Sequence, residues 1–235
     1  MLHKAHLAPA SRYSEDIDLV LVANRSHEGI RKDLAEALEP ILGPPTESFF
    51  TKVRLTLRNL AAKSEIARLN YVYEPTNPLA ATASLKVEVN LTERKPFYDL
   101  TTVSIDVPVL GGVVKVPVVS YDLDEMLGTK LRALIQRDHG RDLYDLWKAL
   151  EVGPGVDGVP KVNPARVGAA FRFYLSQEGS EFSAADVRHT LERRMKSRKF
   201  LNDMDGYLQL GVTYSPKRAQ EVFCEVLLPH LDGSD

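Results

Sequence analysis

The sequence contains a single cysteine, Cys224, among its 235 residues. One thiol excludes an intrachain disulfide and a zinc site built from several cysteines, and it fits a protein of the reducing cytosol. No charged-then-apolar leader opens the chain, and no apolar run approaches the roughly 20 residues that a membrane helix requires. We therefore expect a cytoplasmic protein without a membrane partner.

A large excess of charge of either sign is also absent, because 30 Lys and Arg residues oppose 32 Asp and Glu residues. The whole molecule then has no strong field to attract nucleic acid, and a polyanionic partner would have to meet a local patch. The segment RRMKSRKF, residues 193–200, is one such basic patch. It suits a phosphate backbone, although a solvated helix end explains it nearly as well.

What the sequence does contain changes in character near residue 120. Alternating apolar residues between Pro, Gly, Asn and Thr predict strands at 16–22, 67–74, 83–91, 101–109 and 113–119. Helical periodicity predicts helices at 26–43, 122–138, 140–150, 164–176, 183–196 and 216–228, and 46–64 suits either state. We expect an α+β protein: a small mixed-sheet lobe, residues 1–120, followed by a helical-bundle lobe, residues 121–235, that completes an active-site cleft.

The stretch VPVLGGVVKVP contains a double glycine, Gly111 and Gly112, between two of the predicted strands. Glycines supply the positive φ angles of a tight hairpin turn. A glycine loop that cradles phosphate would need a helix and a Lys-Ser or Lys-Thr directly after it, and neither follows here. The pattern therefore favours a β-hairpin.

Acidic residues occur in the stretch RYSEDIDLVLV, where an apolar run begins. If residues 12–19 are extended, Arg12, Ser14, Asp16 and Asp18 line one side of the strand. Two carboxylates about 7 Å apart on one strand repel unless a cation neutralises them, and Mg²⁺ prefers carboxylate ligands. In LKVEVNL, Glu88 would add a third carboxylate if its strand is the neighbour. The alternative is solvated acids on an exposed edge or wet sheet face.

The stretch EMLGTKLRALIQRDHGRDLYDLWKAL places Lys130 on one predicted helix and Asp142 and Asp145 on the next. The two acids are three residues apart and therefore adjacent on the helix surface. They lie near the helix start, where the positive dipole end is a sufficient structural reason for them. A lysine that reaches a triphosphate, with an acid that orients it or takes a proton, would use the same groups.

Taken in this order, the three stretches resemble the AbiEii-type nucleotidyltransferase toxins, which include the MenT-like toxins of the polymerase β-like superfamily. The resemblance covers residues 2–150 through these motifs. It implies a Mg²⁺-dependent enzyme that transfers a nucleotide from an NTP to RNA, with tRNA 3′ ends the acceptor where this is established. It also implies a cognate antitoxin protein and a role in toxin-antitoxin or phage-defence systems.

The resemblance assigns a role to each matching residue. Asp16, Asp18 and Glu88 would hold Mg²⁺; Arg12, Ser14 and Lys130 would bind the nucleotide; Asp16, Asp18, Lys130, Asp142 and Asp145 would be catalytic. Which of Asp142 and Asp145 is the more essential stays open. Ser14 also falls where some relatives carry a serine or threonine that an antitoxin modifies.

Two alternatives to an RNA-directed nucleotidyltransferase toxin remain open. Relatives carry a GGT or GGS segment upstream of the aspartates, and here the chain begins at Met1 where the end of that segment would fall. Three explanations are open: the start of the chain is misassigned, the chain is truncated, or the protein has lost the glycine segment. A real loss would favour a catalytically impaired module that binds RNA or a protein partner. The other alternative is an aminoglycoside-type nucleotidyltransferase, which shares the metal-binding acids but acts on a small molecule.

Overall fold

The computed structural model of the chain describes residues 2–14, 16–22, 25–57, 60–73, 82–152 and 161–233, excepting the side chains at 49–57, 60–64 and 152. The chain forms two compact units, Ser14–Pro96 and Met1–Tyr13 with Phe97–Asp235. The first is a sheet with one helix, and the second is mainly helical. The predicted α+β class is confirmed. Each unit is described by itself.

The sheet of the Ser14–Pro96 unit is mixed, as predicted. It comprises β1 (Asp16–Val20), β2 (Glu47–Leu57), β3 (Leu60–Tyr73) and β4 (Ala83–Asn90) in the order β1-β4-β3-β2. β1 runs parallel to β4, and the other pairs are antiparallel. The strands predicted at 16–22, 67–74 and 83–91 are confirmed, except that Glu74 lies outside the described residues. The open stretch 46–64 forms β2 and the start of β3.

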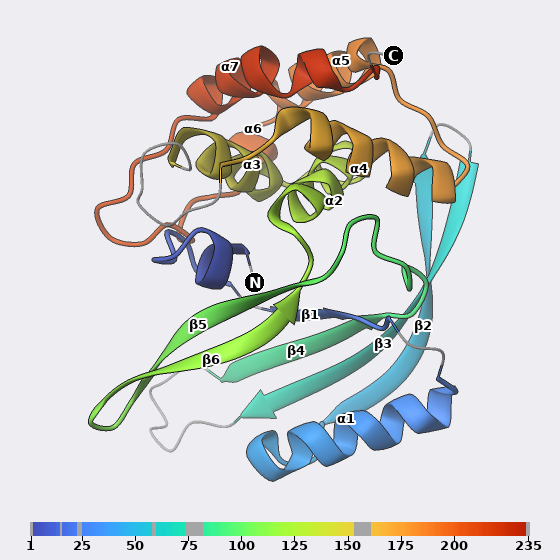
Figure 1. The fold of residues 1–235 in the computed structure, drawn as a ribbon, viewed down its shortest axis with the longest axis vertical. Helices are drawn as coiled ribbons and strands as arrows, with labels where there is room; N and C mark the ends of the chain where they lie inside the picture. The colour runs from blue at the N-terminus through green and yellow to red at the C-terminus, as the bar shows by residue number, and fades with distance from the viewer. Residues whose placement is uncertain are drawn as a thin grey trace. The chain divides into compact units, whose positions relative to one another are not determined.

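Helix α1 (His27–Leu42) covers one face of this sheet (Figure 1). It begins where the Ser26 hydroxyl accepts a hydrogen bond from the Gly29 amide, and it ends at Gly43, whose φ of 74° favours glycine. Buried residues of β3 and β4, among them Leu69 and Val87, pack against the apolar side of α1. Because strand residues alternate faces, the polar residues between them lie on the opposite face.

The Phe97–Asp235 segment opens with the hairpin β5 (Thr101–Val109) and β6 (Gly112–Ser120). Val109 pairs with Gly112, and Gly111 and Gly112 have φ angles of 95° and 158°. Both angles lie where L side chains are strained, so glycine is required at the turn. The predicted hairpin is therefore confirmed.

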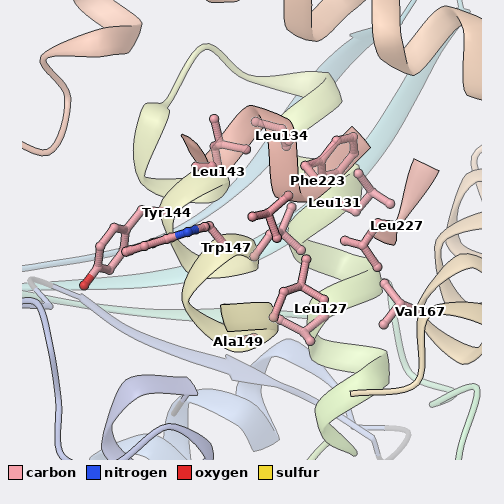
Figure 2. Close-up of a cluster of buried hydrophobic side chains, with 14 of the residues drawn as sticks. Leu127, Leu131, Leu134, Leu143, Tyr144, Trp147, Ala149, Val167, Phe223 and Leu227 are labelled. Carbon is pink, nitrogen blue, oxygen red and sulfur yellow. The ribbon is translucent and has the colours of Figure 1, made fainter. Parts of the chain in front are cut away.

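The helices that follow share one apolar core. They are α2 (Leu123–Gln136), α3 (Gly140–Val152), α4 (Pro164–Gln177), α5 (Ala184–Arg194), α6 (Arg198–Leu201) and α7 (Pro216–Val226), with short helices η1 (Leu2–His6) and η2 (Leu228–His230). Figure 2 shows Leu134 of α2 near Leu143 of α3, and Leu131 of α2 near Phe223 of α7. The five helices predicted after residue 120 are confirmed. The sequence did not predict α6, η1 or η2, and the Gly/Pro-rich stretch 153–160 lies outside the described residues.

The compact units divide the chain differently from the predicted lobes 1–120 and 121–235, which stay a prediction about domains. Residues Leu2 and Leu7 are buried in the helical core. The amides of Phe97 and Tyr98 donate to the buried Glu125 carboxylate over 2.7 and 2.9 Å. These contacts explain why both ends of the predicted first lobe belong with the helices. Among the described residues, no helix is long and apolar enough to cross a membrane.

Candidate functional site

The strand acids of the Ser14–Pro96 unit lie on neighbouring strands. In the parallel β1–β4 pair, Asp16 is opposite Lys86 and Asp18 is opposite Glu88. Residues directly opposite in a ladder share a face of the sheet, and so do alternate residues of one strand. Asp16, Asp18 and Glu88 therefore lie on one face, the face that α1 does not cover. The condition under which Glu88 could join the two aspartates, that its strand is the neighbour, is met.

Two cations accompany the acids on this face. The Lys86 ammonium lies 3.0 Å from Asp16 Oδ2 and 3.6 Å from Glu88 Oε1. Arg68, opposite Glu88 on β3, donates to the Glu88 carboxylate from its guanidinium. Partial burial alone would lower the pKa of Lys86, but the hydrogen bond to Asp16 and the charge of Glu88 outweigh it and raise that pKa. The repulsion between Asp16 and Glu88 is thus relieved by the Lys86 ammonium that lies near both.

The acids fit Mg²⁺ in donor type, because carboxylate oxygens at alternate positions on one face are the ligands that this ion prefers. Across the described ranges, no three His, Cys, Asp or Glu side chains converge closely enough to form a metal cluster. Lys86 supplies the positive charge to Asp16. A divalent cation at Asp16 and Asp18 would take over this neutralising role, while Glu88 stays held by Arg68.

Arg12 does not belong to the acid-bearing strand. β1 begins at Asp16, and Arg12 instead forms an isolated antiparallel bridge with Leu208 in the helical unit. The condition that residues 12–19 form one extended strand is therefore not met, whereas the predicted strand start at Asp16 is confirmed. The Arg12 guanidinium is bonded to a buried carboxylate of α3. Ser14 is exposed, and its hydroxyl donates over 3.4 Å to the backbone carbonyl of Asp16.

That buried carboxylate is Asp145, the centre of a charged cluster in the helical unit. Arg12 donates to it from Nε and Nη2 over 2.6 and 2.8 Å, His3 Nε2 lies 2.7 Å away, and the Lys130 ammonium 3.0 Å away. Complete burial raises the pKa of Asp145, but Lys130, His3 and Arg12 together outweigh it and hold that pKa well below its usual 3.8. Asp145 therefore stays ionised without contact with solvent.

Asp142 forms the second buried carboxylate of the cluster. Arg137 donates two hydrogen bonds of 2.7 Å to it, and the Lys130 ammonium lies 3.7 Å from Oδ1. Lys130 thus lies between two carboxylates that have no solvent exposure, whereas its own side chain keeps 26% of its surface exposed. The arrangement fixes one ammonium group at the edge of a buried anionic pair.

The structure groups the predicted site residues by unit. Lys130, Asp142, Asp145 and Arg12 form one connected cluster in the helical unit, and Asp16, Asp18 and Glu88 share one sheet face in the other. Sequence reasoning missed His3, whose contact with Asp145 spans 142 residues and leaves no local signal. It also missed Lys86, although Lys86 and Glu88 are two residues apart on one strand and therefore share a face.

A known protein family and a solved structure are similar to this chain. Residues 1–223 match the protein family described as nucleotidyl transferase AbiEii toxin, type IV TA system. Among solved structures, the chain is similar to MenT4, a nucleotidyltransferase toxin from Mycobacterium tuberculosis H37Rv. The two share 16% identity over 99% of this chain and 82% of that chain, with a TM-score of 0.39. None of the curated proteins matches the sequence.

Proposed function

Because the chain belongs to the AbiEii family of nucleotidyl transferase toxins, we propose that it is a Mg²⁺-dependent enzyme that transfers a nucleotide to the 3′ end of tRNA. The family is that of a type IV toxin-antitoxin system, which implies a cognate antitoxin. The observation that carries the proposal is the β1–β4 ladder, which sets Asp18 opposite Glu88 and puts Asp16 on the same face.

The proposed reaction is a single displacement at the α-phosphorus of an NTP. The 3′ hydroxyl oxygen of the RNA forms a bond to that phosphorus, the bond to pyrophosphate breaks, and the hydroxyl proton is released to solvent. When bound, Mg²⁺ would neutralise triphosphate charge and orient the phosphoryl oxygens. Asp16 and Asp18 would hold this ion, with the Glu88 carboxylate beside them on the sheet.

Lys130 is the group that binds the triphosphate in this proposal. Its side chain is partly exposed, whereas Asp142 and Asp145 are fully buried, so the carboxylates orient the lysine rather than touch the substrate. Asp145 is the more important of the two, because it lies closer to the ammonium. Arg12 and His3 act through Asp145, since the Arg12 Nε and Nη2 groups are both bonded to it.

Nucleotide binding tests this proposal directly. A ligand that binds the native state raises its melting temperature, so Mg²⁺ with at least one of the four NTPs should stabilise the protein. Lys130→Ala should reduce this shift, and Lys217→Ala, which removes an exposed lysine on α7, should not. An absence of any shift with all four NTPs would favour the impaired binding module. Label transferred to an aminoglycoside and not to RNA would favour the small-molecule enzyme.

A further inference from the structure

Positive charge is concentrated where α5 ends and α6 begins. Five of the chain's 30 Lys and Arg residues lie in the seven residues 193–199, which contain no acid. Four of them, Arg193, Lys196, Arg198 and Lys199, are exposed, and we refer to these four as the α5–α6 basic segment. The fifth, Arg194, is buried. The segment therefore presents a local excess of charge on a chain whose net charge is −2.

The charges of the α5–α6 basic segment are not used within the fold. In the part of the chain that the structure describes, none of the four side chains makes an ion pair or a hydrogen bond. The dipole of α5 accounts for Arg193, which lies in its last turn. It does not account for Lys196, which follows α5, or for Arg198 and Lys199, which begin α6 after its Ser197 cap.

Arg194 anchors this segment to the turn between α2 and α3. Its guanidinium donates to the carbonyl of Ile135 over 2.8 Å and to the carbonyl of Arg137. On α6, the Phe200 carbonyl approaches Gly140 so closely that a Cβ on that glycine would lie 2.1 Å from the oxygen. The anchored turn carries Arg137, which holds Asp142 beside Lys130. The basic segment is thus fixed next to the Lys130 cluster within one unit.

We propose that the α5–α6 basic segment is a docking surface for the phosphate backbone of the acceptor RNA. Unpaired cations at a fixed position bind phosphates and release counterions, whatever the base sequence. An anionic membrane is disfavoured because interfacial binding also needs exposed apolar anchors, and Phe200, the aromatic residue that follows Lys199, is only 1% exposed. The identity of the polyanion as acceptor RNA rests on the proposed function.

The test compares two triple variants by their binding to fluorescently labelled tRNA at several salt concentrations. The first carries Lys196→Gln, Arg198→Gln and Lys199→Gln. The control carries Lys95→Gln, Lys161→Gln and Lys217→Gln, which removes the same charge from exposed lysines elsewhere. The first variant should bind about tenfold or more weakly, and the slope of log affinity against log salt should be shallower by about 2, at ~0.7 per lost contact. The control should bind like the wild type.

Three outcomes would overturn this inference. The first is an equal loss of tRNA affinity in both triple variants, and the second is an unchanged tRNA affinity in the first triple variant. The third is a wild-type protein that binds phosphatidylserine vesicles but not tRNA. Melting temperatures of both variants should equal that of the wild type, because all six side chains are exposed. If the first triple variant has a reduced melting temperature, Lys199→Gln alone replaces it, and this single variant should lose part of the same affinity and salt slope.

The inference and the proposed function fail in distinguishable ways. Binding is measured without NTP, so a wild-type protein that binds tRNA through this segment but transfers nothing would refute only the proposed function. A protein that transfers nucleotide, but whose first triple variant has an unchanged KM for tRNA, would refute only the docking surface. The inference expects that KM to rise about tenfold while kcat changes little.

Discussion

At the scale of single residues, the cluster around Asp145 combines full burial with full charge. A buried carboxylate without partners would be protonated, because removal from water disfavours the charged form. Here Arg12 and Lys130 supply positive charge within 3.0 Å, and His3 adds a short hydrogen bond. Removing one partner of such a group leaves an uncompensated charge, which costs far more than the intact pair contributes.

Arg12→Ala should therefore lower the free energy of unfolding by about 3 kcal/mol, because the buried Asp145 loses two hydrogen bonds and a charge. Urea denaturation measures this change. The control, Arg218→Ala, removes an arginine of the exposed pair with Glu151 and should change stability little. Equal effects of the two substitutions would show that Asp145 does not depend on Arg12.

Asp145 should also shape the acid stability of the protein. Its pKa is lower in the folded state than the unfolded value of 3.8, so its stabilisation is complete above that pH and is lost as the pH falls through the folded pKa. Below pH 3.8 the unfolding free energy of the wild type decreases as the pH falls. Asp145→Asn should make this slope shallower by up to about 1.4 kcal/mol per pH unit, because position 145 then no longer titrates. Urea titrations between pH 6 and pH 2.5 measure this slope. A slope as steep as that of the exposed control Asp205→Asn would contradict the assignment.

Lys86 should compete with Mg²⁺ for the strand acids. Lys86→Ala removes the ammonium from Asp16 and Glu88. Arg68 still neutralises Glu88, but Asp16 loses the charge of Lys86 until a divalent cation binds at Asp16 and Asp18. The variant should melt at a lower temperature than the wild type without Mg²⁺, and Mg²⁺ should raise its melting temperature by more. Lys32→Ala, which removes an exposed lysine of α1, is the control. An identical Mg²⁺ response of Lys86→Ala and wild type would remove the strand acids from metal binding.

At the scale of elements, local signals predicted most of the fold. Helical periodicity over residues 26–43 predicted α1, which the Ser26 cap and Gly43 bound in the structure, and Gly111 with Gly112 predicted the hairpin. β2 could not be assigned because its apolar residues suit a helix as well as a strand, and pairing with β3 over residues 47–57 decides the matter. α6 was missed because four residues are too few for a periodic pattern.

Helices α2 and α4 approach closely at Gly128. A Cβ added there would lie 2.7 Å from Ala170 Cβ and 3.0 Å from the backbone of α4. Gly128→Ala should therefore destabilise the protein by about 1–3 kcal/mol, even though alanine favours helix, because a packed core does not yield. Chemical denaturation measures the loss. Gly29→Ala in α1, where the nearest atom is the Ser26 hydroxyl at 3.3 Å, should cost much less. A neutral Gly128→Ala would contradict the close helix contact.

At the scale of the whole molecule, the sequence predicted which charged residues belong to the candidate site better than it predicted which residues they contact. Alternation along two strands put Asp16, Asp18 and Glu88 on one face, and the β1–β4 pairing agrees. The bonds from His3 and Arg12 to Asp145 join residues 142 and 133 positions apart. No periodic pattern encodes such a contact, since it depends on how the N-terminal residues 3–12 pack against α3.

The most direct test of the proposed activity incubates the protein with total tRNA, Mg²⁺ and each labelled NTP in turn. We predict that label from at least one NTP enters tRNA at its 3′ end, and that a chelator stops the transfer. Asp16→Asn should abolish incorporation, whereas Asp106→Asn, which changes an exposed carboxylate on β5, should leave it unchanged. Transfer that persists at the wild-type rate in Asp16→Asn, or no incorporation from any of the four NTPs, would contradict the account.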